Sequence, residues 1–300
     1  MRNEYLIEMP EDVTEYFCEV VLKRDWPNSI HVYHFIKNAI AWKRGQCTAL
    51  SCYKLFYLPD DIENGTFIGF LSRPEKDYPE VIVTYTSPGN EEQFQRVLIN
   101  THLIKWRNKP LFQAIPSTIK NIVCTTIEEK GLKGKLYSNA VLKWIPADTA
   151  ARLDYEVPSD VYIDQLAVEN IEQIYSLWAH SDVYPKSDIW DTVRLNIGFG
   201  VFSRDSRELL AWAMCGSYGG LSTLIVEPNY RGRGLGKLIV MAVTKEMGQS
   251  GITPHALINM KNNLSLSLFK SVGYMKIPEK YPYILVGDSD TSNSFDSSGP

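Results

Sequence analysis

The segment Val226–Lys237 (VEPNYRGRGLGK) constrains the fold more than any other part of this 300-residue chain. The apolar run before it predicts a strand over 221–226, which Pro228 ends. Apolar residues at helical spacing predict a helix over 235–247 after it. Between these elements three glycines alternate with two arginines, and glycines permit a turn in which successive backbone N–H groups point to one spot. The segment therefore predicts a strand–loop–helix unit with an anion site at the loop.

The charge of this loop contrasts with that of the whole chain. Arg231, Arg233 and Lys237 gather positive charge at the start of the predicted helix, whose unpaired N–H groups and dipole add to it. The chain as a whole has 31 Lys and Arg against 35 Asp and Glu, a net charge of −4. That balance argues against a general nucleic-acid-binding protein. The loop therefore indicates a specific site for a phosphate or pyrophosphate.

The spacing of the glycines excludes two common phosphate-binding motifs. A Walker A loop would need Gly at Arg231 and Ser or Thr at Leu238. A dinucleotide-binding G-x-G-x-x-G that starts at Gly232 would need Gly at Lys237. The pattern that remains is R-x-x-G-x-G, formed by Arg231, Gly234 and Gly236.

The order of the expected elements suggests an internal duplication. The order β-α-β-α-β recurs in both halves at comparable spacing, although residue identity between the halves is low. The proline-containing stretch 146–160 is the expected linker between a domain at 1–145 and one at 161–286, and the Gly- and Ser-rich residues 287–300 are an expected flexible tail. The expected strands are 30–35, 49–58, 66–71, 80–86, 111–115, 135–144, 162–168, 199–203, 209–215, 221–226, 255–260 and 274–286. The expected helices are 91–106, 117–130, 169–180, 186–197, 235–247 and 262–272.

The apolar runs, cysteines and histidines argue against a membrane span and a metal site. No apolar run is long enough for a transmembrane helix, and the N-terminus resembles neither a signal peptide nor a transit peptide. The five cysteines match no zinc spacing, so we expect reduced thiols, most of them in the core. His31 and His34 lie in a strand-like stretch that would point them to opposite faces, which argues against a metal site. We expect no metal and a cytoplasmic location, with a mitochondrial one left open.

At this point the sequence resembles the GNAT superfamily of acyl-CoA N-acyltransferases. The R-x-x-G-x-G loop matches its first motif, and the run from Asn262 to Gly273-Tyr274 matches its second. The resemblance covers about residues 160–286. More narrowly, Leu210-Ala211-Trp212, Glu227–Arg231 and a helical N-terminal domain resemble the glycine N-acyltransferase-like branch. The implied fold is α+β, with two tandem GNAT-like units, each a mixed central sheet flanked by helices, and with the N-terminal unit degenerate.

The resemblance also implies a binding mode for acyl-CoA, which is the expected co-substrate with an acetyl or longer acyl group. Strands 221–226 and 255–260 would splay apart, and the pantetheine arm would lie between them. Its amides would pair with the backbone of Leu224, Ile225 and Val226. Asn262 and Ser265 would line the far wall near the thiol. The cofactor-binding loop would comprise Arg231, Gly232, Arg233, Gly234, Leu235, Gly236 and Lys237.

Two departures from the family pattern concern proton transfer. Phe269 occupies the position where many members carry a tyrosine that acts as the acid, on a helix face expected to line the acyl-CoA site. Gly220 occupies the position where glycine N-acyltransferases place a glutamate base. Tyr218, His255 and Tyr274 are the nearby catalytic candidates, and water is a further one.

The leading functional hypothesis is transfer of an acyl group from acyl-CoA to the amine of a small acceptor, such as glycine or another amino acid. The alternatives are a non-catalytic acyl-CoA-binding module and an acetyltransferase that acts on a protein or polyamine. We expect a small-molecule partner, no nucleic acid and no membrane span; the oligomeric state is open. In the N-terminal half, Glu91 and Glu92 replace the basic residues and would repel a pyrophosphate. That half is expected to be structural, or to form a wall of the acceptor pocket.

Overall fold

The computed structural model describes residues 4–45 and 49–288, which form two compact units. The first unit combines the chain up to Val32, Cys52–Ala140 and the chain from Glu279 onward. The second combines Tyr33–Ser51 and Val141–Pro278. This interleaved division differs from the predicted linear one at 145, because three elements begin in one unit and end in the other. These are the helix α2 (Ile30–Arg44) and the strands β6 (Leu132–Trp144) and β12 (Met275–Asp288).

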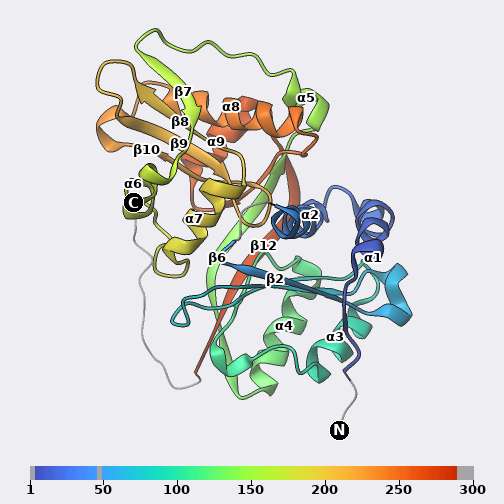
Figure 1. Cartoon of the computed structure of the whole chain (residues 1–300). Coiled ribbons are helices and arrows are strands. Elements are labelled where there is room, and N and C mark those ends of the chain that lie inside the picture. The colour runs from blue at the N-terminus through green and yellow to red at the C-terminus, as the bar shows by residue number, and fades with distance from the viewer. Residues whose placement is uncertain (1–3, 46–48, 289–300) are drawn as a thin grey trace. The chain divides into compact units, whose positions relative to one another are not determined.

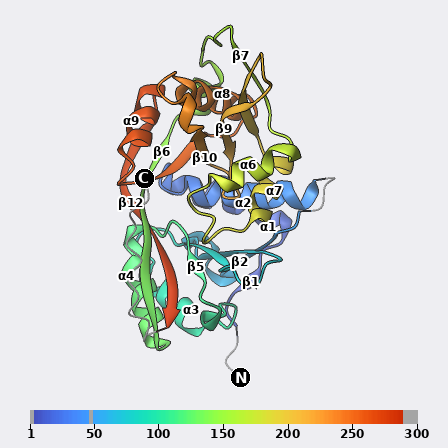
Figure 2. The ribbon, with the colours of Figure 1, turned by 90° about the vertical axis from the view of Figure 1, so that its left-hand side faces the viewer.

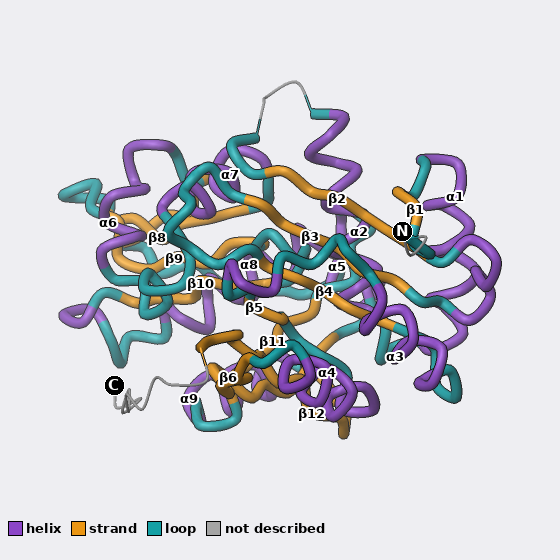
Figure 3. The backbone as a smooth tube through the Cα atoms, turned by 90° about the horizontal axis from the view of Figure 1, so that it is seen from below, coloured by secondary structure: helices purple, strands orange, loops and turns teal. Residues whose placement is uncertain are grey.

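The first unit contains a mixed sheet. Its strands are hydrogen-bonded in the order β1-β2-β3-β4-β5-β12-β6, and β6 and β12 run beside each other (Figure 2). The pairs from β1 to β4 and the pair β5–β12 are antiparallel, whereas β4 and β5 are parallel. Figure 3 shows β2, β3 and β4 side by side. The remaining bounds are β1 Ile7–Glu8, β2 Cys52–Tyr57, β3 Phe67–Ser72, β4 Val81–Tyr85 and β5 Leu111–Phe112.

Two helices bury their apolar faces in the core of this unit. They are α3 (Glu91–Asn100) and α4 (Ser117–Glu129), which pack with Ile68, Ile82 and Phe112. The predicted strand–helix–strand–helix–strand order is present here. Helix α3 ends six residues before its predicted end. Glu91 accepts a hydrogen bond from the Gly89 N–H (3.2 Å), so an acidic side chain occupies the turn, as predicted for the degenerate half.

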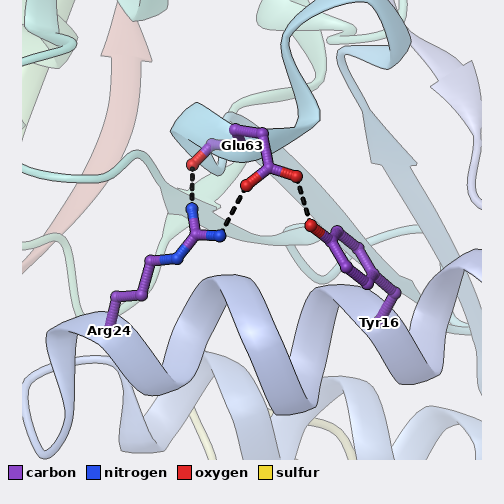
Figure 4. A network of polar contacts seen from close by, with 3 residues as sticks. All are labelled: Tyr16, Arg24 and Glu63. Carbon is purple, nitrogen blue, oxygen red and sulfur yellow. Dashed lines mark hydrogen bonds and ion pairs between the residues drawn. The ribbon is translucent and has the colours of Figure 1, made fainter.

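The N-terminal region is helical, and the strand predicted over 30–35 is wrong. Helix α1 (Glu11–Tyr16), a π turn (Phe17–Val21) and a 3-10 turn (Leu22–Asp25) precede α2, which contains both His31 and His34. The alternation that suggested a strand is misleading because the first turns of α2 are buried on most sides. In the same region Tyr16 and Arg24 both donate to the Glu63 carboxylate, and Arg24 also donates to the Glu63 carbonyl (Figure 4). This exposed network ties the helical segment to the turn Pro59–Asn64.

The second unit is built on an antiparallel sheet in the order β10-β9-β8-β7. Figure 1 shows α8 running along these strands. The predicted elements of this half are all present, although the helix predicted over 169–180 shortens to α6. The sheet bounds are β7 Val161–Gln165, β8 Gly198–Ser203, β9 Leu209–Cys215 and β10 Leu221–Val226. The others are α5 Ala147–Ala151, α6 Ile171–Ser176, α7 Lys186–Leu195, α8 Leu235–Gln249, β11 His255–Asn259 and α9 Asn263–Val272.

The helices cover this sheet from two sides. Leu235, Ile239 and Val243 of α8 share a core with Ala211 and Ala213 of β9. On the alternate side chains of β9, Trp212 and Met214 pack with Ile174 of α6 and Ile189 of α7. Helix α5, at the start of the predicted linker, packs on α8 where a Cβ on Gly248 would lie 2.5 Å from the Ala151 nitrogen. Residues 146–151 are thus a packed part of the second unit.

The predicted tail 287–300 and the five cysteines lie only partly within the described residues. Gly287 and Asp288 end β12, whereas the rest of the predicted tail, 289–300, lies outside the described residues. Cys47 lies outside them as well. Of the described cysteines, Cys18 and Cys215 are buried, Cys124 is partly buried and Cys52 is exposed. The prediction that most cysteines lie in the core therefore holds for two of these four.

Candidate active site

Strand β10 carries a β-bulge in its middle. Ser222 pairs with Met214 and Ile225 with Trp212, so Thr223 and Leu224 together lie opposite the single residue Ala213. Thr223 takes a left-handed φ of 50°, which is uncommon for a β-branched residue. Bulges leave backbone groups unpaired and occur often beside functional sites. Residues 222–226 are half-buried, so this edge strand presents backbone groups that a ligand can bind.

Strands β10 and β11, which the resemblance expects to splay apart, belong to different sheets. They contact each other but are not ladder partners, because β10 ends the four-stranded sheet and β11 lies next to β6 in the other ladder. The Tyr218 hydroxyl donates to the Leu221 carbonyl of β10 (2.8 Å). Tyr218 therefore binds the first residue of β10, and its ring lies 5.7 Å from that of His255 at the start of β11.

The loop between β10 and α8 has an open backbone. Gly232 (φ 78°) and Gly234 (φ 77°) are left-handed, and Gly234 is the N-cap of α8 with no side-chain capping bond. Within the described part of the chain, no acceptor is found for the backbone N–H groups of residues 232–236. A Cβ added to Gly232 or Gly234 would meet no atom within 4 Å. Five successive N–H donors at a helix N-terminus with open space before them form a typical anion site.

The three cations of the loop are arranged differently from the sequence expectation. Arg233 forms an ion pair with Asp160 and lies over the Tyr230 ring. Arg231 turns back, and its Nε donates to the Val226 carbonyl (3.3 Å). Lys237 is exposed, and no ion pair to it is found among residues 4–45 and 49–288. The backbone N–H groups and Lys237 are therefore the groups most available to a phosphate.

Helix α9 places its predicted site residues in two environments. The Asn262 side chain caps the helix by accepting the Ser265 N–H (3.0 Å), which gives both residues a structural role as well. Phe269 is only 3% exposed and lies in the core of the second unit, with its ring 4.9 Å from that of Tyr274. The phenyl ring is thus held by packing on the apolar side of α9.

We expect Phe269→Tyr to destabilise the protein and not to accelerate any reaction. The added hydroxyl would enter the apolar core, where an unsatisfied polar group costs about 1–3 kcal/mol. Urea unfolding of the variant and of the wild type measures this difference. A higher rate at unchanged stability would show instead that the hydroxyl reaches the reacting atoms.

Two of the three proposed acid–base candidates have their hydroxyl groups engaged. The Tyr274 hydroxyl hydrogen-bonds with Thr244 (2.7 Å) inside the core. The Tyr218 hydroxyl donates to the Leu221 carbonyl, as described above. Burial raises the pKa of both phenols above their usual range, so both stay protonated at neutral pH. These contacts favour a structural role for both tyrosines.

His255 and Gly220 form a close contact at the start of β10. A Cβ on Gly220 would lie 2.7 Å from His255 Nε2 and 2.3 Å from Tyr218 Cε2. His255 is fully buried, and its ring stacks on that of His34 with centroids 5.0 Å apart. Nδ1 of His255 lies 3.2 Å from the Thr253 carbonyl, and Nε2 has no hydrogen-bond partner within the described structure. The space that a side chain at position 220 would need is therefore occupied by the rings of Tyr218 and His255.

Helix α2 from His34 onward is a part of this site that sequence reasoning missed. His34 lies against Gly219, where an added Cβ would be 2.7 Å from the His34 carbonyl oxygen. The Asn38 amide donates to the Ser217 carbonyl (3.0 Å). The Trp42 indole donates to Asn196, whose amide donates in turn to the Cys215 carbonyl (2.8 Å). The strand predicted over 30–35 includes only His34, and no element was predicted at Asn38 and Trp42. These contacts anchor the loop 216–220.

We expect the second unit to lose stability on acidification through His255. Burial lowers the pKa of this imidazole from 6.5 to about 4. The unfolded chain therefore binds a proton below pH 6.5 that the folded chain resists, so stability falls as the pH drops from 6.5 toward 4. The shift corresponds to about 3 kcal/mol. Urea unfolding at pH 7.5 and pH 4.5 measures it, with His255→Phe as the control that should show a smaller pH dependence. An equal pH dependence in both proteins would contradict this assignment.

Family models and solved structures of other proteins match this chain. A family model described as FR47-like protein matches residues 198–283, and a domain of unknown function, DUF5645, matches residues 6–126. A search of curated protein sequences gave no significant match. An X-ray structure of a Drosophila protein superposes with a TM-score of 0.85 at 21% identity, covering 96% of this chain and 100% of that one.

Two further solved structures with a similar fold are acetyltransferase-type proteins by name. A tandem GNAT protein from the clavulanic acid biosynthesis pathway has a TM-score of 0.56 at 10% identity, covering 96% and 99% of the two chains. A GCN5-related N-acetyltransferase from Kribbella flavida has a TM-score of 0.54 at 14% identity, covering 91% and 96%. The chain thus has a tandem GNAT fold. None of these comparisons distinguishes the glycine N-acyltransferase-like branch.

No group of three or more His, Cys, Asp or Glu side chains among the described residues could hold a metal ion. None of the helices in that part of the chain has the length and apolar character needed to cross a membrane.

Proposed function

We propose that this protein is an acyl-CoA-dependent N-acyltransferase that moves an acetyl or longer acyl group to the amine of a small acceptor, such as glycine or another amino acid. The observation that carries the proposal is the run of five unpaired N–H groups over residues 232–236, directly after a bulged, half-buried edge strand. The loop would hold the pyrophosphate, and β10 would pair with the pantetheine amides. A backbone N–H at the bulge would stabilise the oxyanion of the tetrahedral intermediate.

The carboxylates around the loop are engaged by neighbouring side chains. Asp160 is paired with Arg233, Glu227 accepts from Gln173 (2.7 Å), and Glu208 accepts from Tyr230 (3.2 Å). A polyamine or a basic protein tail would need unpaired negative charge at the acceptor side. Acetylation of a protein or polyamine is the alternative, and a panel of acceptors tests it.

The experiment has two steps. Calorimetry with coenzyme A tests the binding site. Mass spectrometry of the coenzyme A and amides released from acetyl-CoA and benzoyl-CoA, each with glycine, glutamine and polyamines, then tests transfer and identifies the acceptor class. Amine-dependent release is expected with an amino acid. Absence of coenzyme A binding would overturn the proposal.

A second candidate, a non-catalytic acyl-CoA-binding module, is favoured by one observation. Gly220 has no room for a side-chain base, and Phe269 has no hydroxyl. For a binding module we expect acyl-CoA to bind without any amine-dependent release of thiol. The same two assays therefore separate the two candidates.

A further inference from the structure

Two hydroxyl groups of β10 lie side by side, which a regular strand does not allow. Consecutive residues of a strand point their side chains to opposite faces, yet Ser222 Oγ and Thr223 Oγ1 are only 3.4 Å apart. The bulge between Ser222 and Ile225, with the left-handed φ of 50° at Thr223, accounts for this placement. The bulge therefore gathers both hydroxyls at one point of the strand.

The strain at Thr223 is not compensated by hydrogen bonds of these hydroxyls to the rest of the fold. Among residues 4–45 and 49–288, the contact between the two hydroxyls is the only hydrogen bond found for either of them. Each hydroxyl carries one proton, and their mutual bond uses one of the two, so one O–H remains to donate to a ligand. Backbone strain of this kind is concentrated at functional sites, which makes the pair a candidate for chemistry.

A ligand can reach the pair from the edge of the sheet. Ser222 and Thr223 are both half-buried, and β10 is the last strand of its four-stranded sheet. Gly216 leaves room for the Ser222 hydroxyl, because a Cβ added there would lie 2.5 Å from Ser222 Oγ. The hydroxyls are carried by the same bulge whose backbone N–H is proposed to bind the oxyanion. They therefore lie beside the place proposed for the thioester carbon, which bonds to both the attacking nitrogen and the leaving sulfur.

We propose that the hydroxyls of Ser222 and Thr223 relay a proton from the attacking amine to the leaving thiolate. The inference rests on the proposed function. The neutral amine attacks the thioester carbon, the C–N bond forms, and the C–S bond breaks. The nitrogen gives a proton to one hydroxyl, that hydroxyl passes its own proton to the other, and the second hydroxyl protonates the sulfur. Each hydroxyl starts and ends with one proton, and the products are the amide and coenzyme A.

A relay suits a site that lacks an ionisable group at the expected acid and base positions. Phe269 lies in the core and has no hydroxyl, and Gly220 has no room for a carboxylate. A single aliphatic hydroxyl is both a weak acid and a weak base, so it does not hold an extra proton or a negative charge. Two hydroxyls in contact avoid both charged forms, because each passes on a proton as it accepts one.

Two variants remove one hydroxyl each and little else. Thr223→Val retains the β-branched shape at the left-handed position, and Ser222→Ala shortens a half-buried side chain. We expect each variant to lower kcat by about 100-fold and to leave the Kd for coenzyme A within about threefold of the wild type. The double variant should be only as slow as the single variants, because a relay fails as a unit.

Two further variants serve as controls. Thr223→Ser retains a hydroxyl at the bulge and should keep kcat within about threefold of the wild type. Ser250→Ala removes an exposed hydroxyl at the C-cap of α8, at the end opposite the loop 232–236, and should leave kcat and Kd unchanged. The measurements are the amine-dependent release of thiol for kcat and calorimetry with coenzyme A for Kd.

The outcomes separate this inference from the proposed function. If the wild type transfers the acyl group and either Ser222→Ala or Thr223→Val does so at a rate within about threefold of it, the relay is wrong, although the acyltransferase assignment stands. If the wild type binds coenzyme A but transfers to no amine, the proposed function fails and the relay with it. Loss of coenzyme A binding by both variants, or losses in kcat that multiply in the double variant, would also overturn the relay. Slow single variants with unchanged affinity, no further loss in the double variant and a fast Thr223→Ser support it.

Discussion

Replacement of Gly234 by valine should weaken the binding of coenzyme A by at least 100-fold. Gly234 has a φ of 77°, and a β-branched residue is strained there. A Cβ at this position would also enter the open space in front of the N–H groups of residues 232–236, where the phosphate would lie. Loss of two hydrogen bonds to a charged group, at about 1.5–3 kcal/mol each, corresponds to more than a 100-fold change in affinity.

The chain offers a matched control for this variant. Gly251 follows the other end of α8, has a φ of 73°, and also has no atom within 4 Å of an added Cβ. Gly251→Val therefore introduces the same backbone strain and the same open side chain away from the loop. Calorimetry should show wild-type affinity for Gly251→Val and no measurable binding for Gly234→Val. Binding by Gly234→Val within threefold of the wild type would disprove the phosphate site.

A glutamate introduced at position 220 should disrupt the second unit and should not add activity. Its Cβ would lie 2.3 Å from Tyr218 Cε2 and 2.7 Å from His255 Nε2. Neither ring can move freely, because Tyr218 is bound to Leu221 and His255 to Thr253. A new carboxylate would also be buried without a cation. We expect a loss of at least about 3 kcal/mol in the free energy of unfolding, because overpacking and charge burial add.

Thermal and urea unfolding measure this loss. Gly287→Glu is the control, since the nearest atom to its added Cβ is the Lys133 carbonyl oxygen at 3.9 Å. That variant should remain within about 1 kcal/mol of the wild type. A folded Gly220→Glu protein with a higher rate would show that the loop 216–220 opens to admit a side-chain base, which contradicts the arrangement of His255.

The loop between β10 and α8 could be predicted from sequence because its conformation depends on neighbouring residues. The predicted bounds of β9 and β10 match the observed strands, and Pro228 and the glycines mark the turn between β10 and α8. The left-handed conformations of Gly232 and Gly234 follow from what glycine alone tolerates. The strand predicted over 30–35 was wrong, because alternation of apolar and polar residues identifies a strand only when one face is exposed. In α2 the residues Ile30, Val32 and Phe35 are all buried.

Which side chains are available for proton transfer depends instead on contacts between residues that are distant in sequence. Tyr218, His255 and Tyr274 were equal candidates in sequence, and the structure distinguishes them by their partners Leu221, Thr253 and Thr244. Arg233 was expected to be free for phosphate, but its partner Asp160 lies 73 positions away. Backbone conformation is governed by neighbouring residues, so glycine and proline patterns reveal it. The protonation and availability of a side chain depend on burial and on what packs against it, and these arise only when the chain has folded.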